Sequence, residues 1–373
     1  MSEAMKNDIP EINFEKRAEQ ILSNEPILAA KDVEVQFKLR GQKLTAIRKC
    51  SLELYDGETL AIVGESGSGK SVSAMSVLRL LDANGYIAGG TVTFDGQDLS
   101  KVTTEQMYHI RGNRISVIFQ EPMTSLNPVF SVKKQLSEPF IIHQGMSKKE
   151  AAAKCIEMLK AVQIPNPEAV AKQYPHQLSG GMRQRVMIAM ALACKPDILI
   201  ADEPTTALDV TIQAQILELM KKLQKTNQMG IIFITHNLGI VAEICDKVSV
   251  MYAGKIVEKG TINEIFYDPK HPYTWGLLSA MPDLDTDDER LYTIPGSPPN
   301  LLHETQGDAF AARNKYALEV DDKADPPMFK VSDTHYAATW LLDPRAPKVE
   351  MPQELKARLE RMKKEAKDYG SKL

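Results

Sequence analysis

The sequence predicts an α/β protein with a parallel central sheet, and three observations support this fold class. A glycine-rich loop at residues 64–71 lies between a short apolar run and a helical pattern. Short alternating runs before that loop have the pattern of antiparallel strands. Three later apolar runs, each long enough for one buried strand, end at polar side chains.

The glycine-rich loop matches the phosphate-binding pattern G-x-x-x-x-G-K-[ST]. Its glycines let successive backbone N–H groups turn toward an anion, and the following helix presents its positive N-terminus. A plain strand-to-helix turn is the alternative, but the full match and its flanks favour a nucleoside triphosphate site. We expect Lys70 to reach the terminal phosphates and Ser71 to ligate Mg²⁺. The predicted loop consists of Gly64, Glu65, Ser66, Gly67, Ser68, Gly69, Lys70 and Ser71.

Strand patterns flank this loop. Residues 33–37 alternate, and runs at 44–47 and 50–54 follow, with a turn at 56–57. After the loop and its helix, residues 89–96 return to strand and turn. We therefore expect an antiparallel sheet beside the core.

The three later apolar runs occupy residues 116–119, 198–201 and 231–234. Continuous apolar runs suit parallel strands that are covered on both faces, and ligands bind at the carboxyl ends of such strands. We expect the polar residues at these ends to converge on the triphosphate held by Lys70. They are Gln120, Asp202, Glu203 and His236.

Composition and charge argue against nucleic-acid binding and against a membrane-spanning or secreted protein. The net charge is −4, from 45 basic and 49 acidic residues, so the chain has no electrostatic footprint for nucleic acid. No apolar run approaches the roughly 18 residues that a membrane span needs, and the polar N-terminus lacks the apolar core of a signal peptide. The cysteines are far apart without metal-ligand spacing, which indicates buried free thiols in a reducing, cytosolic compartment. They are Cys50, Cys155, Cys194 and Cys245.

Changes in pattern along the chain predict its organisation. Residues 1–27 are charged and form an N-terminal extension, and residues 28–265 form the nucleotide-binding domain. A mostly helical stretch at about 121–195 separates two strands of the predicted sheet and is expected to be an inserted helical subdomain. Residues 266–373 form a proline-rich, irregular C-terminal extension. It ends in a charged helix at 353–367, which we expect to be solvated.

A Leu-Ser-Gly-Gly-Met-Arg-Gln run at 178–184 opens a long helix. Alone it could be a helix cap and a tight turn. Placed after the phosphate loop and before an Asp-Glu-Pro sequence, it closely resembles the ATPase subunits of ATP-binding-cassette transporters. The resemblance covers about residues 28–262. It rests on Phe37, Gln120, residues 178–184, Asp202, Glu203, residues 207–209 and His236.

This resemblance implies a RecA-like P-loop NTPase core with an antiparallel β subdomain, an inserted α-helical subdomain, and ATP and Mg²⁺ as cofactors. Phe37 would stack on the adenine, and Ser71, Gln120 and Asp202 would hold Mg²⁺. Glu203 would be the general base that polarises the attacking water, and His236 would contact the γ-phosphate.

The resemblance also implies that two chains sandwich ATP. Ser179 and Gly181 would contact the γ-phosphate bound by the opposite subunit. Gly180 and Asp209 are also expected to take part in nucleotide binding.

Four stretches narrow the resemblance to the oligopeptide and dipeptide importer branch, although ordinary loop chemistry is the alternative. The implied partners are a second, non-identical ATPase subunit in a heterodimer, two transmembrane permease subunits and, indirectly, a peptide-binding protein. The chain would be a peripheral protein on the cytoplasmic face of a bacterial cell membrane, without a nucleic-acid partner. Nickel importers of the same branch, soluble cassette ATPases acting on ribosomes or DNA, and a catalytically silent scaffold are the alternatives. The stretches are residues 121–128, 174–177, 271–274 and 294–296.

One departure from that branch affects a cofactor. Its ATPases often carry a C-terminal iron–sulfur cluster on four cysteines, in a pattern like G-C-x-F-x-x-R-C-P. Here residues 307–315 read Gly-Asp-Ala-Phe-Ala-Ala-Arg-Asn-Lys, and Asp308, Asn314, Asp321 and Thr339 occupy the cysteine positions. Because such clusters require thiolates, we expect no iron–sulfur cluster. The extension would fold by packing of Phe310, Tyr316, Phe329, Trp340 and Leu341.

Overall fold

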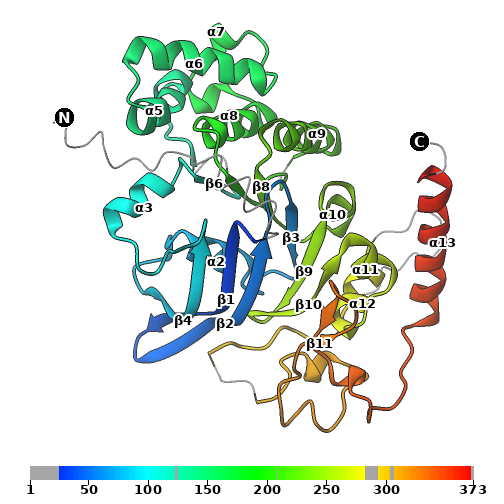
Figure 1. Cartoon of the computed structure of the whole chain (residues 1–373). Helices are drawn as coiled ribbons and strands as arrows, with labels where there is room; N and C mark the ends of the chain where they lie inside the picture. The colour runs from blue at the N-terminus through cyan, green and yellow to red at the C-terminus, as the bar shows by residue number, and fades with distance from the viewer. Residues whose placement is uncertain (1–24, 122–124, 207, 282–292, 303–305, 371–373) are drawn as a thin grey trace. The chain divides into compact units, whose positions relative to one another are not determined.

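A computed structural model describes residues 25–121, 125–206, 208–281, 293–302 and 306–370 (Figure 1). The chain separates into two compact units, each described by itself. The first unit comprises the described residues of Met1–Ala29, Glu53–Glu58 and Val92–Phe233. The second unit comprises those of Ala30–Leu52, Thr59–Thr91 and Ile234–Leu373. Most of the predicted N-terminal extension, Met123 and Ala207 lie outside the described residues, and the predicted domain boundaries stay predictions.

Three strands that lie wholly or mostly in the first unit are those expected from the apolar runs. They are β6 (Ile115–Ile118), β7 (Ile198–Asp202) and β8 (Gly230–Thr235), neighbours in the order β8-β7-β6. β6 pairs with β7 in parallel, as predicted, and β7 and β8 are buried throughout. The parallel pairing brings the carboxyl ends of β6 and β7 to one edge.

Helices make up most of the stretch between β6 and β7, as predicted. α8 packs against α5, α6 and β6, and its burial on nearly all sides explains its apolar sequence. Ser147 and Glu150 form the capping box that starts α6. The helical elements of the unit are α3 (Thr104–Ile110), α5 (Val132–Gln144), α6 (Lys148–Ala161), α7 (Pro167–Val170), η2 (Pro175–Gln177), α8 (Gly180–Leu192) and α9 (Val210–Asn227).

The strands before and after the phosphate loop form a separate sheet, most of whose residues belong to the second unit. Its order is β2-β1-β4-β5. The runs predicted at 44–47 and 50–54 belong to one continuous strand. The strands are β1 (Leu28–Leu39), β2 (Gln42–Leu54), β4 (Gly85–Phe94) and β5 (Gln97–Asp98), of which β5 pairs antiparallel with β4.

The C-terminal extension joins the sheet of the second unit. β3 (Thr59–Val63) pairs in parallel with β9 (Lys247–Tyr252), and β9 pairs antiparallel with β10 (Lys255–Thr261). The short strands β12 (Tyr336–Ala337) and β11 (Phe329–Lys330) then continue the sheet beyond β10. The extension is therefore built onto the core and is not a separate appendage.

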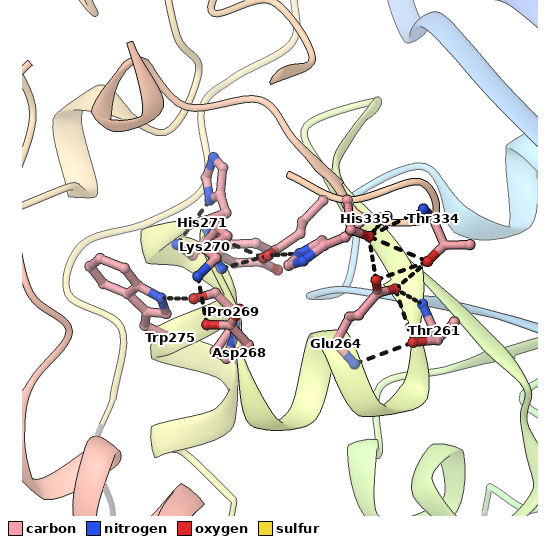
Figure 2. Close-up of polar contacts among 12 residues, drawn as sticks. Thr261, Glu264, Asp268, Pro269, Lys270, His271, Trp275, Thr334 and His335 are labelled. Carbon is pink, nitrogen blue, oxygen red and sulfur yellow. Dashed lines mark hydrogen bonds and ion pairs between the residues drawn. The ribbon is translucent and has the colours of Figure 1, made fainter. Parts of the chain in front are cut away.

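The second unit also contains helical elements. They are α2 (Lys70–Val77), α10 (Leu238–Ile244), α11 (Ile262–Tyr267), α12 (Pro272–Ser279), η3 (Ala311–Arg313), η4 (Trp340–Leu342) and α13 (Gln353–Gly370). At the start of α11, Glu264 accepts hydrogen bonds from the Thr261 N–H and the Thr334 hydroxyl (Figure 2). Just before α12, the Glu258 carboxylate links the Lys270 N–H to the His335 ring. Within the described residues, no helix combines the length and the hydropathy that a membrane crossing requires.

One apolar core contains residues from both the sheet and the extension. Phe310 is buried there against the rings of Tyr252 and Tyr273. Leu355 and Leu359, one turn apart on α13, are 3% and 4% exposed in the same core. The terminal helix therefore presents the expected solvated face, but it also buries an apolar face, which was not expected. Its charged residues lie on one face, and Leu355 and Leu359 on the other face pack into the core.

Candidate nucleotide site

The phosphate loop requires its glycines at two positions. A Cβ on Gly64 would lie 2.1 Å from the carbonyl oxygen of Met251, so only glycine allows the loop to pass β9 this closely. Gly69 has φ +102° and directly precedes α2, where a side chain would be strained. The loop therefore ends at the N-terminus of α2, as the sequence predicted.

Two polar groups inside the loop fit an anionic ligand. The Lys70 Nζ donates to the carbonyl oxygens of Gly64 and Glu65, at 2.9 Å each. The Ser68 Oγ is buried and has no hydrogen-bond partner among the residues described. A buried hydroxyl without a partner is unusual, and a phosphate oxygen would satisfy it. An ammonium, this hydroxyl and a helix N-terminus suit the phosphates of ATP.

Phe37 and His236 belong to the same unit as the loop. Phe37 is half-buried on β1, and its ring lies so close to Gly85 of β4 that a Cβ there would clash at 2.7 Å. His236 is exposed directly after β8. Their predicted contacts with the adenine and the γ-phosphate stay predictions.

The first unit brings Gln120 and Glu203 together. The Glu203 Oε2 accepts hydrogen bonds from Gln120 Nε2 at 3.0 Å and from Thr206 Oγ1 at 2.9 Å. Glu203 has φ +46°, a strained conformation for this residue type of the kind that functional sites retain. Asp202, the last residue of β7, is 5% exposed. The carboxyl ends of β6 and β7 thus position a carboxylate whose orientation two donors fix.

Ser179 and Asp209, two of the predicted nucleotide-site residues, cap helices. The Ser179 Oγ accepts the Met182 N–H at 3.3 Å at the start of α8, and the Asp209 carboxylate accepts the Ile212 N–H at 3.0 Å at the start of α9. Gly181 lies where a Cβ would be 2.8 Å from Ile212 Cγ2, which explains a glycine at that position by helix packing. The nucleotide contacts predicted for Ser179, Gly180, Gly181 and Asp209 stay predictions.

Convergence of the whole site also stays a prediction. Lys70 and His236 belong to the second unit, whereas Gln120, Asp202 and Glu203 belong to the first. Each unit separately carries the chemistry expected of its half: an anion-binding loop in one and an oriented carboxylate in the other.

Sequence reasoning missed two residues that contact the loop. Tyr273 Oη accepts the backbone N–H of Glu65 at 2.8 Å, and the Arg313 guanidinium pairs with the Glu65 carboxylate. The sequence singled out the runs that contain both residues, but it offered no signal that either one reaches the loop.

The four residues at the cysteine positions of the related pattern are used locally. Each accepts a backbone N–H within its own turn. The pairs are Asp308 Oδ1 with Phe310 N at 3.0 Å, Asn314 Oδ1 with Tyr316 N at 3.0 Å, Asp321 Oδ2 with Leu318 N at 2.6 Å, and Thr339 Oγ1 with Leu341 N at 3.3 Å. Burial raises the pKa of Asp308 to about 6, which disfavours its charged form. Within the described parts of the chain, no group of three or more His, Cys, Asp or Glu could hold a metal ion.

Aromatic pairs pack the extension around these turns, as the sequence predicted. Tyr316 packs on Trp275 and Phe329 on Trp340, both edge to face, at ring-centroid distances of 5.5 and 6.1 Å. The cysteines are free thiols; Cys50, Cys155 and Cys194 are buried and Cys245 is partly exposed. Burial raises the pKa of all four thiols, so these thiols are poor metal ligands.

We predict that the protein carries no iron–sulfur cluster, because hydrogen-bonded oxygen donors replace the thiolates that such clusters need. Protein purified without oxygen should be colourless, without the thiolate-to-iron absorbance expected at about 400 nm. Iron and sulfide in stoichiometric amounts would show that the alignment of residues 307–340 is misplaced.

Comparison with known proteins gives the family. Residues 47–206 match the ABC transporter family, and residues 257–320 match the oligopeptide/dipeptide transporter C-terminal region. The oligopeptide transport ATP-binding protein OppD of Bacillus subtilis is 55% identical over 90% of this chain and 94% of its own length. The dipeptide transport ATP-binding protein DppD of Lactococcus lactis is 53% identical over 91% of this chain and 98% of its own length.

Solved structures agree with this match. A dimeric structure of the ATP-binding cassette MJ0796, in a post-hydrolysis state bound to ADP and Pi, has a TM-score of 0.57 at 28% identity. It covers 63% of this chain and 98% of its own. The CbiO1 structure from Clostridium perfringens, part of the ABC transporter complex CbiONQ, has a TM-score of 0.56 at 27% identity. The match covers 65% of this chain and 92% of the CbiO1 chain.

The fold and the loop define an ATPase of the ATP-binding-cassette class, which confirms the predicted fold class. The chain belongs to the family of ABC transporter ATP-binding subunits, in the branch that carries the oligopeptide/dipeptide C-terminal region.

Proposed function

We propose that this chain hydrolyses ATP to drive the uptake of oligopeptides or dipeptides across the cytoplasmic membrane. The observation that carries the proposal is the combination of an anion-binding loop and a docked C-terminal extension in one chain. The relatives named for peptide transport share both regions, over 94% and 98% of their own lengths.

In this mechanism the loop N–H groups and Lys70 hold the β- and γ-phosphates, and Phe37 stacks on the adenine. Glu203, fixed by Gln120 and Thr206, orients the water that attacks the γ-phosphorus and takes its proton as ADP leaves. His236 contacts the transferred phosphate. Ser71, Gln120 and Asp202 would hold Mg²⁺, which neutralises phosphate charge when bound.

The partners follow from the same proposal. A second, non-identical ATPase subunit forms a heterodimer with this chain, in which Ser179 and Gly181 face the ATP bound by the other subunit. Gly180 and Asp209 also belong to the nucleotide site. Two permease subunits bind the pair at the cytoplasmic face of a bacterial membrane, and a peptide-binding protein delivers substrate outside. The dimeric form of the MJ0796 cassette supports the sandwich.

The sequence predicts that residues 120–128, which follow the γ-phosphate site directly, contact the permease through Met123 and Leu126, but Leu126 does not suit this role. Leu126 is 1% exposed, so a charge there would disturb the fold before any docking. Met123 lies outside the described residues. We therefore extend the proposed contact segment to residue 130, because Val129, 69% exposed, and Phe130, 36% exposed, are apolar side chains on the surface.

Reconstituted vesicles test this function. ATP should drive accumulation of short peptides, and Val129→Glu should reduce that uptake while ATP hydrolysis continues. Ile142→Glu, which places the same charge at a residue 64% exposed outside the segment, is the control and should leave uptake intact.

Uptake of nickel but not of peptides would contradict the proposed substrate. Co-purification with ribosomes or DNA, without membrane subunits, would favour a soluble cassette ATPase.

A further inference from the structure

An ion pair links the phosphate loop to the C-terminal extension. The Arg313 Nη1 lies 2.6 Å from Glu65 Oε2, and Nη2 lies 3.0 Å from Glu65 Oε1. The pairing is bidentate, the strongest arrangement of a guanidinium with a carboxylate. The side chain of Arg313 is 4% exposed and that of Glu65 is 30% exposed, so water screens the pair only partly.

The extension also fixes Arg313 from the other side. Its Nε donates to the carbonyl oxygen of Pro295 at 2.8 Å, and its Nη2 also donates to that of Ile294 at 3.3 Å. Its Nη1 also donates to Tyr252 Oη at 3.3 Å. The guanidinium therefore cannot follow Glu65 freely if the loop moves.

Glu65 is held through its backbone as well. Its N–H donates to the hydroxyl of Tyr273, a residue of α12 that is fully buried. Burial raises the pKa of Tyr273, so the hydroxyl stays protonated and neutral at physiological pH. Pro298, Pro299 and Leu301 line a pocket together with residues 65–68. The extension thus contacts the loop along its first turn.

The charge of Glu65 makes this arrangement relevant to nucleotide binding. A carboxylate in a loop that receives a triphosphate repels the phosphates, and the repulsion is strong wherever water is excluded. An arginine keeps its charge at every physiological pH and cancels that carboxylate. The backbone contact to Tyr273 holds the same residue in place, so neutralisation and positioning act together.

We propose that Arg313 is a positioning residue that makes the phosphate loop competent for ATP, by neutralising Glu65 and fixing the first turn of the loop. The contacts of Arg313 with Ile294 and Pro295 then set the affinity for ATP, which makes the C-terminal extension a regulator of the nucleotide site. This inference rests on the proposed binding of ATP at the loop.

A mutant cycle on the full chain in its complex tests the inference. Arg313→Gln should raise the Kd and KM for ATP by roughly tenfold with little change in kcat, and the effect should shrink at high salt. In the Glu65→Gln background, Arg313→Gln should raise the Kd for ATP by less than about twofold, because the repelling charge is gone. Arg313→Lys should retain most of the affinity. Arg345→Gln, which removes an equal charge from a side chain that is 88% exposed and pairs with Asp343, is the control.

The outcomes separate three cases. An equal loss of affinity in both Glu65 backgrounds would mean that Arg313 supports only the fold of the extension, and would overturn the proposal. An unchanged Kd for Arg313→Gln would overturn it too. If the unmodified protein binds ATP no better than Lys70→Ala does, the proposed function itself fails, whatever Arg313 does.

Discussion

Replacing Glu203 with Gln is expected to slow ATP hydrolysis by about 10²–10⁴-fold, the usual cost of losing a general base. Gln keeps the shape of the side chain and can still contact Gln120 and Thr206, but it cannot accept the proton of the attacking water. Binding of ATP depends on the loop and Lys70, in the other unit, and should be retained. Single-turnover hydrolysis in the assembled complex, beside equilibrium ATP binding, measures the two effects separately.

Thr206→Val is the matched control for this prediction. It removes one hydrogen bond to the same carboxylate and leaves the negative charge. We expect a smaller loss of rate, of roughly tenfold. Equal losses in Thr206→Val and Glu203→Gln would indicate that the orientation of residue 203, and not its basicity, limits the reaction.

Glu258→Ala is expected to give the largest loss of stability. Glu258 is fully buried and accepts the Lys270 N–H at 2.6 Å and the His271 N–H at 3.1 Å, and it lies 2.8 Å from His335 Nε2. Lys270, His271 and His335 lie together in Figure 2. Removing the carboxylate leaves these donors buried without an acceptor, which typically costs about 3–5 kcal/mol.

Chemical or thermal unfolding of the full chain measures this loss. Asp268→Ala, on the same turn, breaks an ion pair with Lys270 whose partners are 59% and 27% exposed, and should cost at most about 1 kcal/mol. If both variants unfold alike, the buried contacts of Glu258 do not hold the extension to β10.

Local patterns predicted those parts of the site that sit at strand ends. The apolar runs identified β6 and β7, and parallel pairing then required their carboxyl ends to lie together. The hydrogen bond between Gln120 and Glu203 agrees with that expectation. The glycines of the loop were equally predictable, because their backbone conformations exclude other residues.

The contacts of the extension were not predictable in the same way. Glu65 and Arg313 lie 248 positions apart in the sequence, so no periodicity connects them. β11 and β12 are two residues long, too short to show alternation. Leu126 stands among polar and turn residues, which suggested exposure, yet it is buried. For α13 the signal was present: Leu355 and Leu359 are spaced by one turn, but the surrounding charges obscured them.

The central claim is that the nucleotide held by the phosphate loop is hydrolysed by Glu203. The nucleotide retained by the purified Glu203→Gln complex after incubation with ATP and Mg²⁺ tests this most directly. We predict that it is uncleaved ATP and that a Lys70→Ala complex retains none. Retention of ADP, with turnover close to that of the unmodified complex, would show that Glu203 does not have the assigned role.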